Sequence, residues 1–258
     1  MQTMGFWALL IIGSCGHLMA GAAARSSEPQ KYVAHRLRQS HTVDADWDSD
    51  VWRHVPALEI RHPMGAPPNH RPRTQAKVLY DDLSLYVIFR VEDQYVRAVA
   101  RKHHDAVCRD SCVEFFFTPR ADVQPGYLNL EMNCCGMLLF GIHTPETPDG
   151  LMAAEDCEKI EIARSLPQQT IDPEISTPVV WTIECRLPFE VLRKYIAFDA
   201  PAPGGSWRTN FYKCGDATSH PHWLTWSVVN LPQPDFHQPA FFGWLDFGPE
   251  LTTKLDRK

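Results

Sequence analysis

The sequence predicts an all-β fold: a two-sheet antiparallel β-sandwich, jelly-roll-like, with one short helix and long Pro-rich loops. Several segments alternate apolar and polar residues with a period of two, which is typical of half-buried strands. The chain has 21 prolines against 14 glycines in 258 residues. Because proline cannot donate to a sheet ladder, it collects in loops and at strand ends. Short strands separated by such loops are typical of a sandwich.

The length and composition fit one large domain. The chain is 44% hydrophobic and 22% charged, which provides enough apolar material for a sizeable core. We expect a mobile leader over residues 25–40, a single domain over 41–248 and a C-terminal tail over 249–258, because no stretch inside 41–248 has the composition of a linker. The net charge is -6 and no basic stripe is visible, so nucleic acid is not expected as a partner.

Residues 1–24 are predicted to be a signal peptide. An apolar run over 6–12 is followed by three alanines at 22–24, which are typical of a cleavage site, and then by a polar segment. A second interpretation is a lipoprotein signal in which Cys15 carries the lipid. The run is too short for a typical membrane-spanning helix. The protein is therefore expected to be secreted or periplasmic, with a lipid anchor at the cell surface as the alternative.

The strands follow from the alternation in chain order. Residues 76–80 and 85–91 alternate on either side of a turn and predict a hairpin. The clearest alternation lies over 127–133, and residues 137–142 should pair with it across the turn at 134–136. The remaining predicted elements are strands over 112–118, 180–187, 207–214 and 242–247, and one helix over 189–195.

The alternation also sends polar side chains to one face of several strands. Glu131 opposes the core-facing Leu130 and Met132, and Glu114 opposes Phe115 in the same way. Sugar hydroxyls both donate and accept, so carboxylates, amides and guanidinium groups suit them, and a sugar ring packs on an aromatic ring. The predicted sugar-binding residues are Glu114, Asn129, Glu131, Asn133, Arg208, Asn210, Tyr212, Phe236 and His237.

A structural explanation of the same pattern stays open, because any sandwich has polar solvent faces without a function. Glu184 and Arg186 alternate in the same way on the 180–187 strand, and such opposite charges stabilise a sheet modestly. Trp223 and Trp226 lie in predicted loops and could add further rings to the platform, although Trp226 is the better candidate for the core.

Cysteine and histidine patterns do not indicate a metal centre. Seven cysteines follow the predicted signal peptide, and an odd number does not describe a complete disulfide framework. Cys108 and Cys112 are four apart and Cys134 and Cys135 are adjacent, which is not zinc-site spacing. We expect several buried free thiols, with one or two disulfides as the alternative. The histidines at 103–104 and at 220 and 222 are interpreted as surface loops.

No cofactor is expected, but a structural calcium ion is the best metal candidate. Calcium needs clustered oxygen ligands. The run of alternating aspartates in the opening segment is the place where the sequence offers them, at Asp44, Asp46, Asp48 and Asp50.

Six segments in order carry a family resemblance. They are DADW…VW at 44–52, AKVLYDDLSLYV at 76–87, DSCVEFF at 110–116, WTIE…LPF at 181–189, WRTNFYK at 207–213 and the closing FHQP…FG at 236–243. Together they resemble the family 9 carbohydrate-binding modules. The resemblance implies a jelly-roll-like sandwich and non-catalytic recognition of an extracellular glycan that supports carbohydrate catabolism.

The resemblance also implies roles for individual residues. In such modules the end of a glycan lies between two aromatic rings above polar groups. Phe236 corresponds to one ring, Glu114 to the Glu that bonds the sugar, and Glu131 and Asn133 to the strand with further polar contacts. The second ring has no counterpart in residues 106–108. Such modules can also carry structural calcium.

Two other functions compete with passive binding. Glu114 and Glu131 on neighbouring strands could lie about 5 Å apart, the spacing of a retaining glycosidase. Related sandwiches hold haem between a methionine and a histidine, but Met132 is predicted to face the core, and the chain has no C-x-x-C-H attachment motif.

Overall fold

A computed structural model of the chain describes residues 28–251, so the predicted signal peptide, Cys15 and residues 252–258 lie outside the described part. Its strands are β1 (Lys31–Arg36), β2 (Leu58–Ile60), β3 (His62–Pro63), β4 (Arg73–Tyr80), β5 (Ser84–Asp93), β6 (Val96–Ala98), β7 (Cys112–Thr118), β8 (Tyr127–Asn133), β9 (Leu138–His143), β10 (Gly150–Leu151), β11 (Glu161–Arg164), β12 (Ile171–Ile175), β13 (Val179–Pro188), β14 (Ser206–Cys214), β15 (Trp223–Thr225) and β16 (Gly243–Glu250). The helices are α1 (Ala154–Cys157) and α2 (Phe189–Leu192), with 3-10 turns at Val107–Arg109 and Pro239–Phe241.

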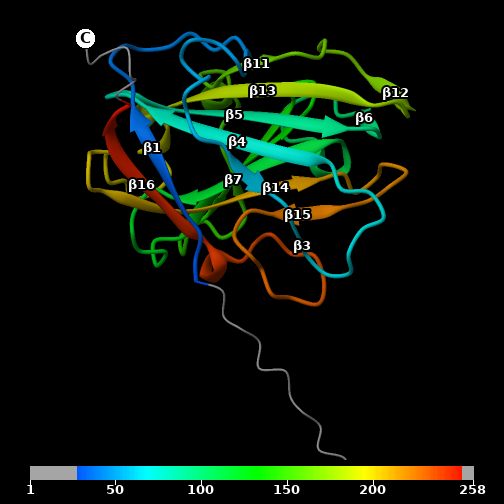
Figure 1. Cartoon of the computed structure of the whole chain (residues 1–258). Coiled ribbons are helices and arrows are strands. Elements are labelled where there is room, and N and C mark those ends of the chain that lie inside the picture. The colour runs from blue at the N-terminus through cyan, green and yellow to red at the C-terminus, as the bar shows by residue number, and fades with distance from the viewer. Residues whose placement is uncertain (1–27, 252–258) are drawn as a thin grey trace, which may run out of the picture.

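The strands form two layers of one curled sheet (Figure 1). One layer has the order β10-β9-β8-β7-β14-β16 and the other β1-β4-β5-β13-β11, while β12 and β6 form a small second sheet. The predicted β-sandwich is therefore confirmed, with one difference. Strand β1 pairs in parallel with both β16 and β4 and joins the layers, so the sheet is mixed rather than purely antiparallel.

Strand β1 corrects the expectation of a mobile leader. Residues 31–36 lie inside the sheet, with Tyr32 and Ala34 buried in the main core. The Tyr32 hydroxyl donates to the Pro56 carbonyl at 2.7 Å and accepts from the Val78 amide at 3.2 Å. Only two residues of this strand face the core, which is too short an alternation to distinguish a strand from a polar leader. At the other end, β16 extends to Glu250, into the expected tail.

The predicted hairpins are present, and local side chains fix their turns. In the β4–β5 hairpin, Asp81 Oδ1 accepts from the amides of Leu83 at 2.8 Å and Ser84 at 2.7 Å. In the β8–β9 hairpin, Asn133 Oδ1 accepts from the amides of Cys135 and Met137. Asn and Asp favour turns because their side chains bond the nearby backbone in this way. The predicted strands at 112–118 and 127–133 match β7 and β8 residue for residue.

The core lies between the two layers. It takes the predicted faces of β7, β8 and β13, including Phe115, Leu130, Met132 and Trp181. Met132 is fully buried in this apolar core, as expected. Helix α2 is shorter than the predicted helix, and α1 was not predicted, so the chain has two short α-helices in its described part rather than one. Neither helix within residues 28–251 is long and apolar enough to cross a membrane.

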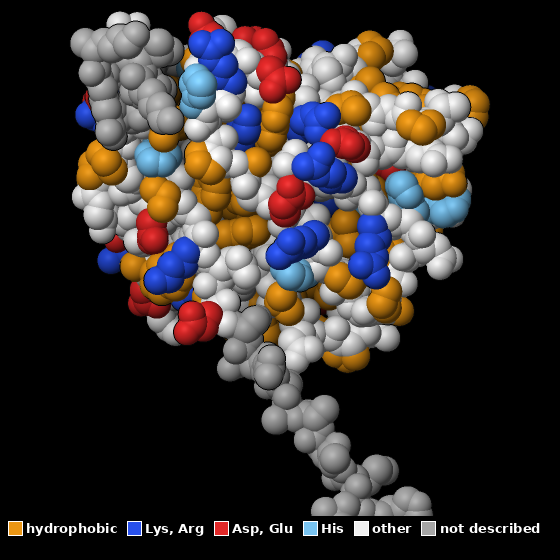
Figure 2. Space-filling model, in the orientation of Figure 1, with side chains coloured by type: hydrophobic (Ala, Val, Ile, Leu, Met, Phe, Trp, Pro, Cys, Tyr) orange, Lys and Arg blue, Asp and Glu red, His pale blue; other side chains and the backbone are white. Residues whose placement is uncertain are grey.

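The outward surface mixes both signs of charge. Figure 2 shows basic and acidic side chains next to one another on the face seen in Figure 1. On the outer side of β4 and β5, Arg73 lies 3.6 Å from Glu59 and 3.0 Å from Glu92, and Arg90 lies 2.5 Å from Glu92. Such exposed pairs stabilise the fold little.

Candidate functional site

The structure brings the predicted polar residues of β8, β7 and β14 onto one face. Glu131 lies opposite Glu114, and Glu114 lies opposite Tyr212, so these three form one row across the sheet. The next row is Asn129, Phe116 and Asn210, and the row on the other side is Asn133, Cys112 and Cys214. The alternation therefore identified a shared face correctly.

This face is covered rather than open, because the chain between β15 and β16 lies over it. The Phe236 ring stacks on Tyr212 with centroids 4.2 Å apart, and the Tyr212 hydroxyl donates to the Phe236 carbonyl at 3.1 Å. Phe236 is only 8% exposed. Phe236 is thus a packing residue with one side toward a cavity, not a free ring at a loop tip.

Four of the predicted binding residues hold this cover or a turn in place. Asn210 Oδ1 accepts from the Ser227 amide at 2.8 Å while its Nδ2 donates to the Ser227 carbonyl. The Arg208 guanidinium donates to the Phe242 and Gly243 carbonyls. Asn133 caps the β8–β9 turn, and Tyr212 is fully buried. The period of a strand indicates which side chains share a face but not what packs over them, which is why sequence alone assigned these residues to a ligand.

Between the sheet face and its cover lies a cavity of about 250 Å³, which we call the carboxyl cavity. Glu114 and Glu131 line it from the sheet, and the rings of Trp223, Phe236 and His237 line it from the loops. The other lining residues are Cys108, Cys214, Asp216, Pro234 and Asp235. A cavity of this size is slightly below the range of about 300–1,000 Å³ for drug-sized ligands, so it suits the end of a chain molecule rather than a long segment.

Two of the four carboxyls that line the cavity, Glu114 and Glu131, are strongly perturbed. Glu114 is 2% exposed and Glu131 is 6% exposed. Burial, and then the negative charge of Glu131, raise the pKa of Glu114 well above its usual range. Burial raises the pKa of Glu131 to about 7, although a hydrogen bond from Asn129 Nδ2 at 2.9 Å acts in the opposite direction. Two acids facing each other away from water therefore cannot both be charged at neutral pH.

A second hollow of about 470 Å³ adjoins the first and shares His237. Its wall is the Tyr127 ring stacked on His143, with centroids 4.6 Å apart. The Tyr127 hydroxyl lies 2.9 Å from His237 Nδ1, and His143 Nε2 lies 2.9 Å from Asn129 Oδ1. Through Asn129, this aromatic wall is connected by hydrogen bonds to Glu131.

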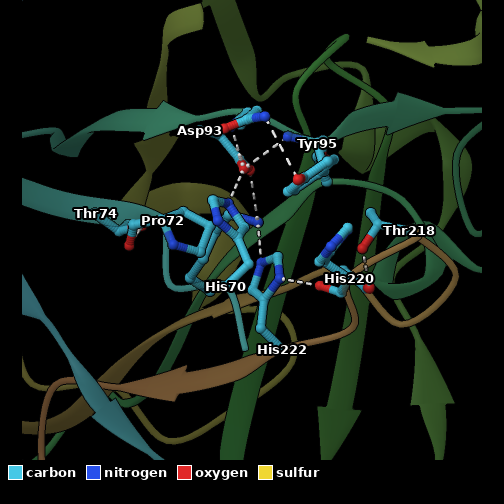
Figure 3. A network of polar contacts seen from close by, with 12 residues as sticks. His70, Pro72, Thr74, Asp93, Tyr95, Thr218, His220 and His222 are labelled. Carbon is cyan, nitrogen blue, oxygen red and sulfur yellow. Dashed lines mark hydrogen bonds and ion pairs between the residues drawn. The ribbon is translucent and has the colours of Figure 1, made fainter. Parts of the chain in front are cut away.

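A separate polar network lies on the core side of β14 (Figure 3). Asp93 Oδ1 lies 2.7 Å from His70 Nε2, and Lys213 Nζ lies 3.8 Å from the other Asp93 oxygen. Lys213 Nζ also donates to His222 Nε2 at 2.8 Å, while His222 Nδ1 donates to the His220 carbonyl. His222 is fully buried, so the expectation of a surface loop is wrong for this histidine. The network crosses between the layers and is structural.

The aspartate run does not form a calcium cluster. The Asp44 and Asp46 side chains each accept from the amide two residues on, and Asp50 pairs with Arg53 at 2.8 Å. These carboxylates thus shape turns in the segment that covers the outer face of β13. The same segment explains Glu184, which lies in the other layer and not on the predicted polar face: it accepts from the Trp52 indole and from two backbone amides.

Sequence reasoning missed several lining residues. Cys214 shares the face of Tyr212 by the same alternation and could have been found. Trp223 was named only as a loop aromatic, and Cys108 and Asp216 come from loops whose position no periodicity encodes. The thiols are free and, Cys108 apart, buried among the described residues, as expected.

Comparisons with known proteins agree with this architecture. The sequence profile of carbohydrate-binding family 9 matches residues 65–247, and the chain belongs to that family. No curated protein matches the chain.

Solved structures give the same fold. A Bacteroides uniformis protein assigned provisionally to carbohydrate binding is 24% identical, with a TM-score of 0.77 over 85% of this chain and 100% of that one. A family 9 module from Caldicellulosiruptor kristjanssonii, solved in complex with cellotriose, is 14% identical, with a TM-score of 0.59 over 87% of this chain and 97% of that one. The same module in complex with glucose gives the same identity and TM-score, with 98% of its chain covered.

Proposed function

We propose that this protein binds the end of an extracellular glycan in the carboxyl cavity, without catalysis, in support of carbohydrate breakdown. The observation that carries the proposal is the cavity itself: Glu114 and Glu131 from the sheet and three rings from the loops line it, in a chain of carbohydrate-binding family 9. Carboxyl groups match sugar hydroxyls, and rings match the apolar face of a pyranose. Export through the predicted signal peptide belongs to the same proposal.

The arrangement favours a single sugar unit at the end of a chain. The carboxyl cavity is small and would hold the terminal sugar. The adjoining hollow, which shares His237, would hold the next sugar unit of the chain. Glu131 Oε2 has no hydrogen-bond partner within the described residues, so a sugar hydroxyl would satisfy a buried acceptor that the protein leaves unpaired.

Calorimetric titration tests the proposal. Glucose and cellotriose, the ligands of the Caldicellulosiruptor module, are the first probes, followed by an array of plant and algal glycans. Binding should be weakened about tenfold or more in Glu131→Gln, since a hydrogen bond to a charged group contributes about 1.5–3 kcal/mol. Glu92→Gln, on the outer face of the other layer, is the control and should bind normally. Absence of binding to every glycan would refute the proposal.

The directly opposed carboxyls also favour a second function, glycoside hydrolysis. A carboxyl with a pKa near 7, such as Glu131, can act as a general acid. Family 9 modules, however, are binding domains. Chromatography of cello-oligosaccharides incubated with the protein separates the two functions: release of sugar that disappears in Glu131→Gln would establish hydrolysis, and binding without turnover would exclude it.

A further inference from the structure

Two thiols and a carboxyl meet at the base of the carboxyl cavity, and we call these three residues, Cys112, Glu114 and Cys214, its floor. Glu114 and Cys214 line the cavity, and Cys112 is fully buried beside them. Cys112 on β7 lies directly opposite Cys214 on β14, and Glu114 lies two residues along β7 on the same face. The Cys214 thiol donates to Glu114 Oε1 at 3.0 Å. One ligand atom from each of the three residues lies within 4.8 Å of the others, and all three residues are buried.

The carboxyl of this floor has no direct ion pair, although the charge of Lys213 acts on Glu114 from the other face of the sheet and acts to lower its pKa. No lysine or arginine forms an ion pair with Glu114 or Glu131 within residues 28–251. Lys213 neighbours Cys214 in sequence, but its ammonium is on the core side, bonded to His222 and to the Cys214 carbonyl. Glu131 Oε2, in a side chain only 6% exposed, is unpaired beside the same cavity. A buried acid without an ion pair stays protonated, or it ionises when it binds a metal.

We propose that the floor of the cavity binds one thiophilic divalent cation such as Zn²⁺, through the sulfurs of Cys112 and Cys214 and the carboxylate of Glu114. Zinc binds sulfur at about 2.3 Å and carboxylate oxygen at about 2.0–2.2 Å, so tetrahedral ligand atoms lie roughly 3.5–4 Å apart. The observed cluster needs only small side-chain movements to reach that spacing. Binding releases the protons of both thiols and of the Glu114 carboxyl, whose pKa is raised by burial. The two thiolates and the carboxylate then outweigh the charge of the ion by one negative charge.

A fourth position on such an ion would be open to the cavity, which Glu114 and Cys214 line. Cys108 and Glu131 line it there, and three protein ligands with one open position are typical of zinc sites that contact a further molecule. Local cysteine spacing could not indicate this site, because the ligands come from strands about a hundred residues apart in sequence and meet only through the β7–β14 register.

The described residues contain a second cluster of side chains that could bind a metal, but it is a weaker candidate for the site. It consists of His41, Asp44 and Glu184. Both Glu184 oxygens already accept from protein donors, the Trp52 indole at 2.9 Å and the amides of Asp44 at 3.0 Å and Ala45 at 2.9 Å, and His41 Nε2 lies 2.9 Å from Oε1. That carboxylate is satisfied by the protein itself, in contrast to the floor of the cavity.

Cobalt titration of the full chain, reduced and freed of metal by a chelator, tests the site. We expect one Co²⁺ per chain, with the near-ultraviolet charge-transfer absorption of thiolate ligation, and its loss when Zn²⁺ is added. Cys112→Ala and Cys214→Ala should lose this absorption. Cys185→Ala, which removes an equally buried thiol from β13 in the core, should keep it. If the cysteine variants fail to fold, Glu114→Gln provides the test instead. It preserves the shape of the site and should weaken cobalt binding.

Two results would overturn the proposal. One is folded, reduced protein that takes up no cobalt with thiolate absorption. The other is a Cys112–Cys214 disulfide, found by mass spectrometry in protein purified without reductant, since the two residues are direct partners across the strands. Glycan titration of the metal-free chain tests sugar binding independently of the metal. A negative cobalt titration would therefore overturn the metal site without affecting the proposed sugar binding.

Discussion

Adjacent residues of β14 lead to two buried polar clusters on opposite faces of the same layer. Lys213 points to the core side and joins Asp93 and His222, where each acid or base has a protein partner. Cys214 points to the other side and joins Glu114 at the carboxyl cavity, where Glu114 and Glu131 form no ion pair within residues 28–251. The acid of the first cluster has an ion-pair partner, Lys213 at 3.8 Å, whereas the two glutamates of the second have none in the described residues. Charge balance thus distinguishes a structural network from a binding site, although both are equally buried.

The largest effect should come from breaking the first cluster. Lys213→Met leaves the Asp93 carboxylate buried without its ammonium partner, and such a loss costs about 3–5 kcal/mol of unfolding free energy. Urea denaturation measures this cost. Glu114→Gln is the matched change in the second cluster, measured in metal-free protein: it removes a carboxyl that has no ion-pair partner in the described residues and should not lower the unfolding free energy. If both variants lowered the unfolding free energy equally, the two clusters would not differ in the way that their ion pairing predicts.

The pH dependence of stability should come next in size. Burial, together with the nearby Lys213 ammonium, lowers the pKa of His222 to about 3, whereas a histidine in an unfolded chain titrates near about 6.5. Asp93 and His70 also face this ring and Asp93 acts in the opposite direction. Below about pH 6.5 the unfolded state binds a proton that the folded state does not, so acidification destabilises the fold.

From about pH 7 to about pH 5 this single group should remove roughly 2 kcal/mol of stability. His222→Gln keeps an acceptor for Lys213 but does not titrate, so its denaturation midpoint should fall less over the same range. Chemical denaturation at both pH values gives the difference. A variant with the same pH dependence as the unaltered chain would show that His222 is protonated in the folded state.

A smaller effect is expected at the ring that lines the carboxyl cavity. Trp223→Ala removes an aromatic surface worth about 0.5–1.5 kcal/mol, so glycan affinity should fall between about twofold and tenfold. Trp47→Ala is the control, because that ring lies over Lys77 on the outer face of the other layer. Calorimetry should show normal binding by the control. Unchanged affinity in Trp223→Ala would place the sugar elsewhere.

The sequence predicted more of the fold than of the binding site, and the reason is physical. The alternation over β7 and β8 identified their bounds, their core faces and the shared polar face, because side chains of a strand alternate strictly. The cover over that face was not predictable: Phe236 packs on Tyr212, and Asn210 holds Ser227, through contacts between segments distant in sequence. Strand β1 was missed because only Tyr32 and Ala34 mark its buried side.

The crystal structure of the protein soaked with cellotriose tests the central claim most directly. We predict a terminal sugar in the carboxyl cavity, with a hydroxyl within hydrogen-bond distance of Glu131 and its ring against Trp223 or His237. A sugar bound at a different surface, with the cavity still closed and Glu131 unpaired, would contradict the account.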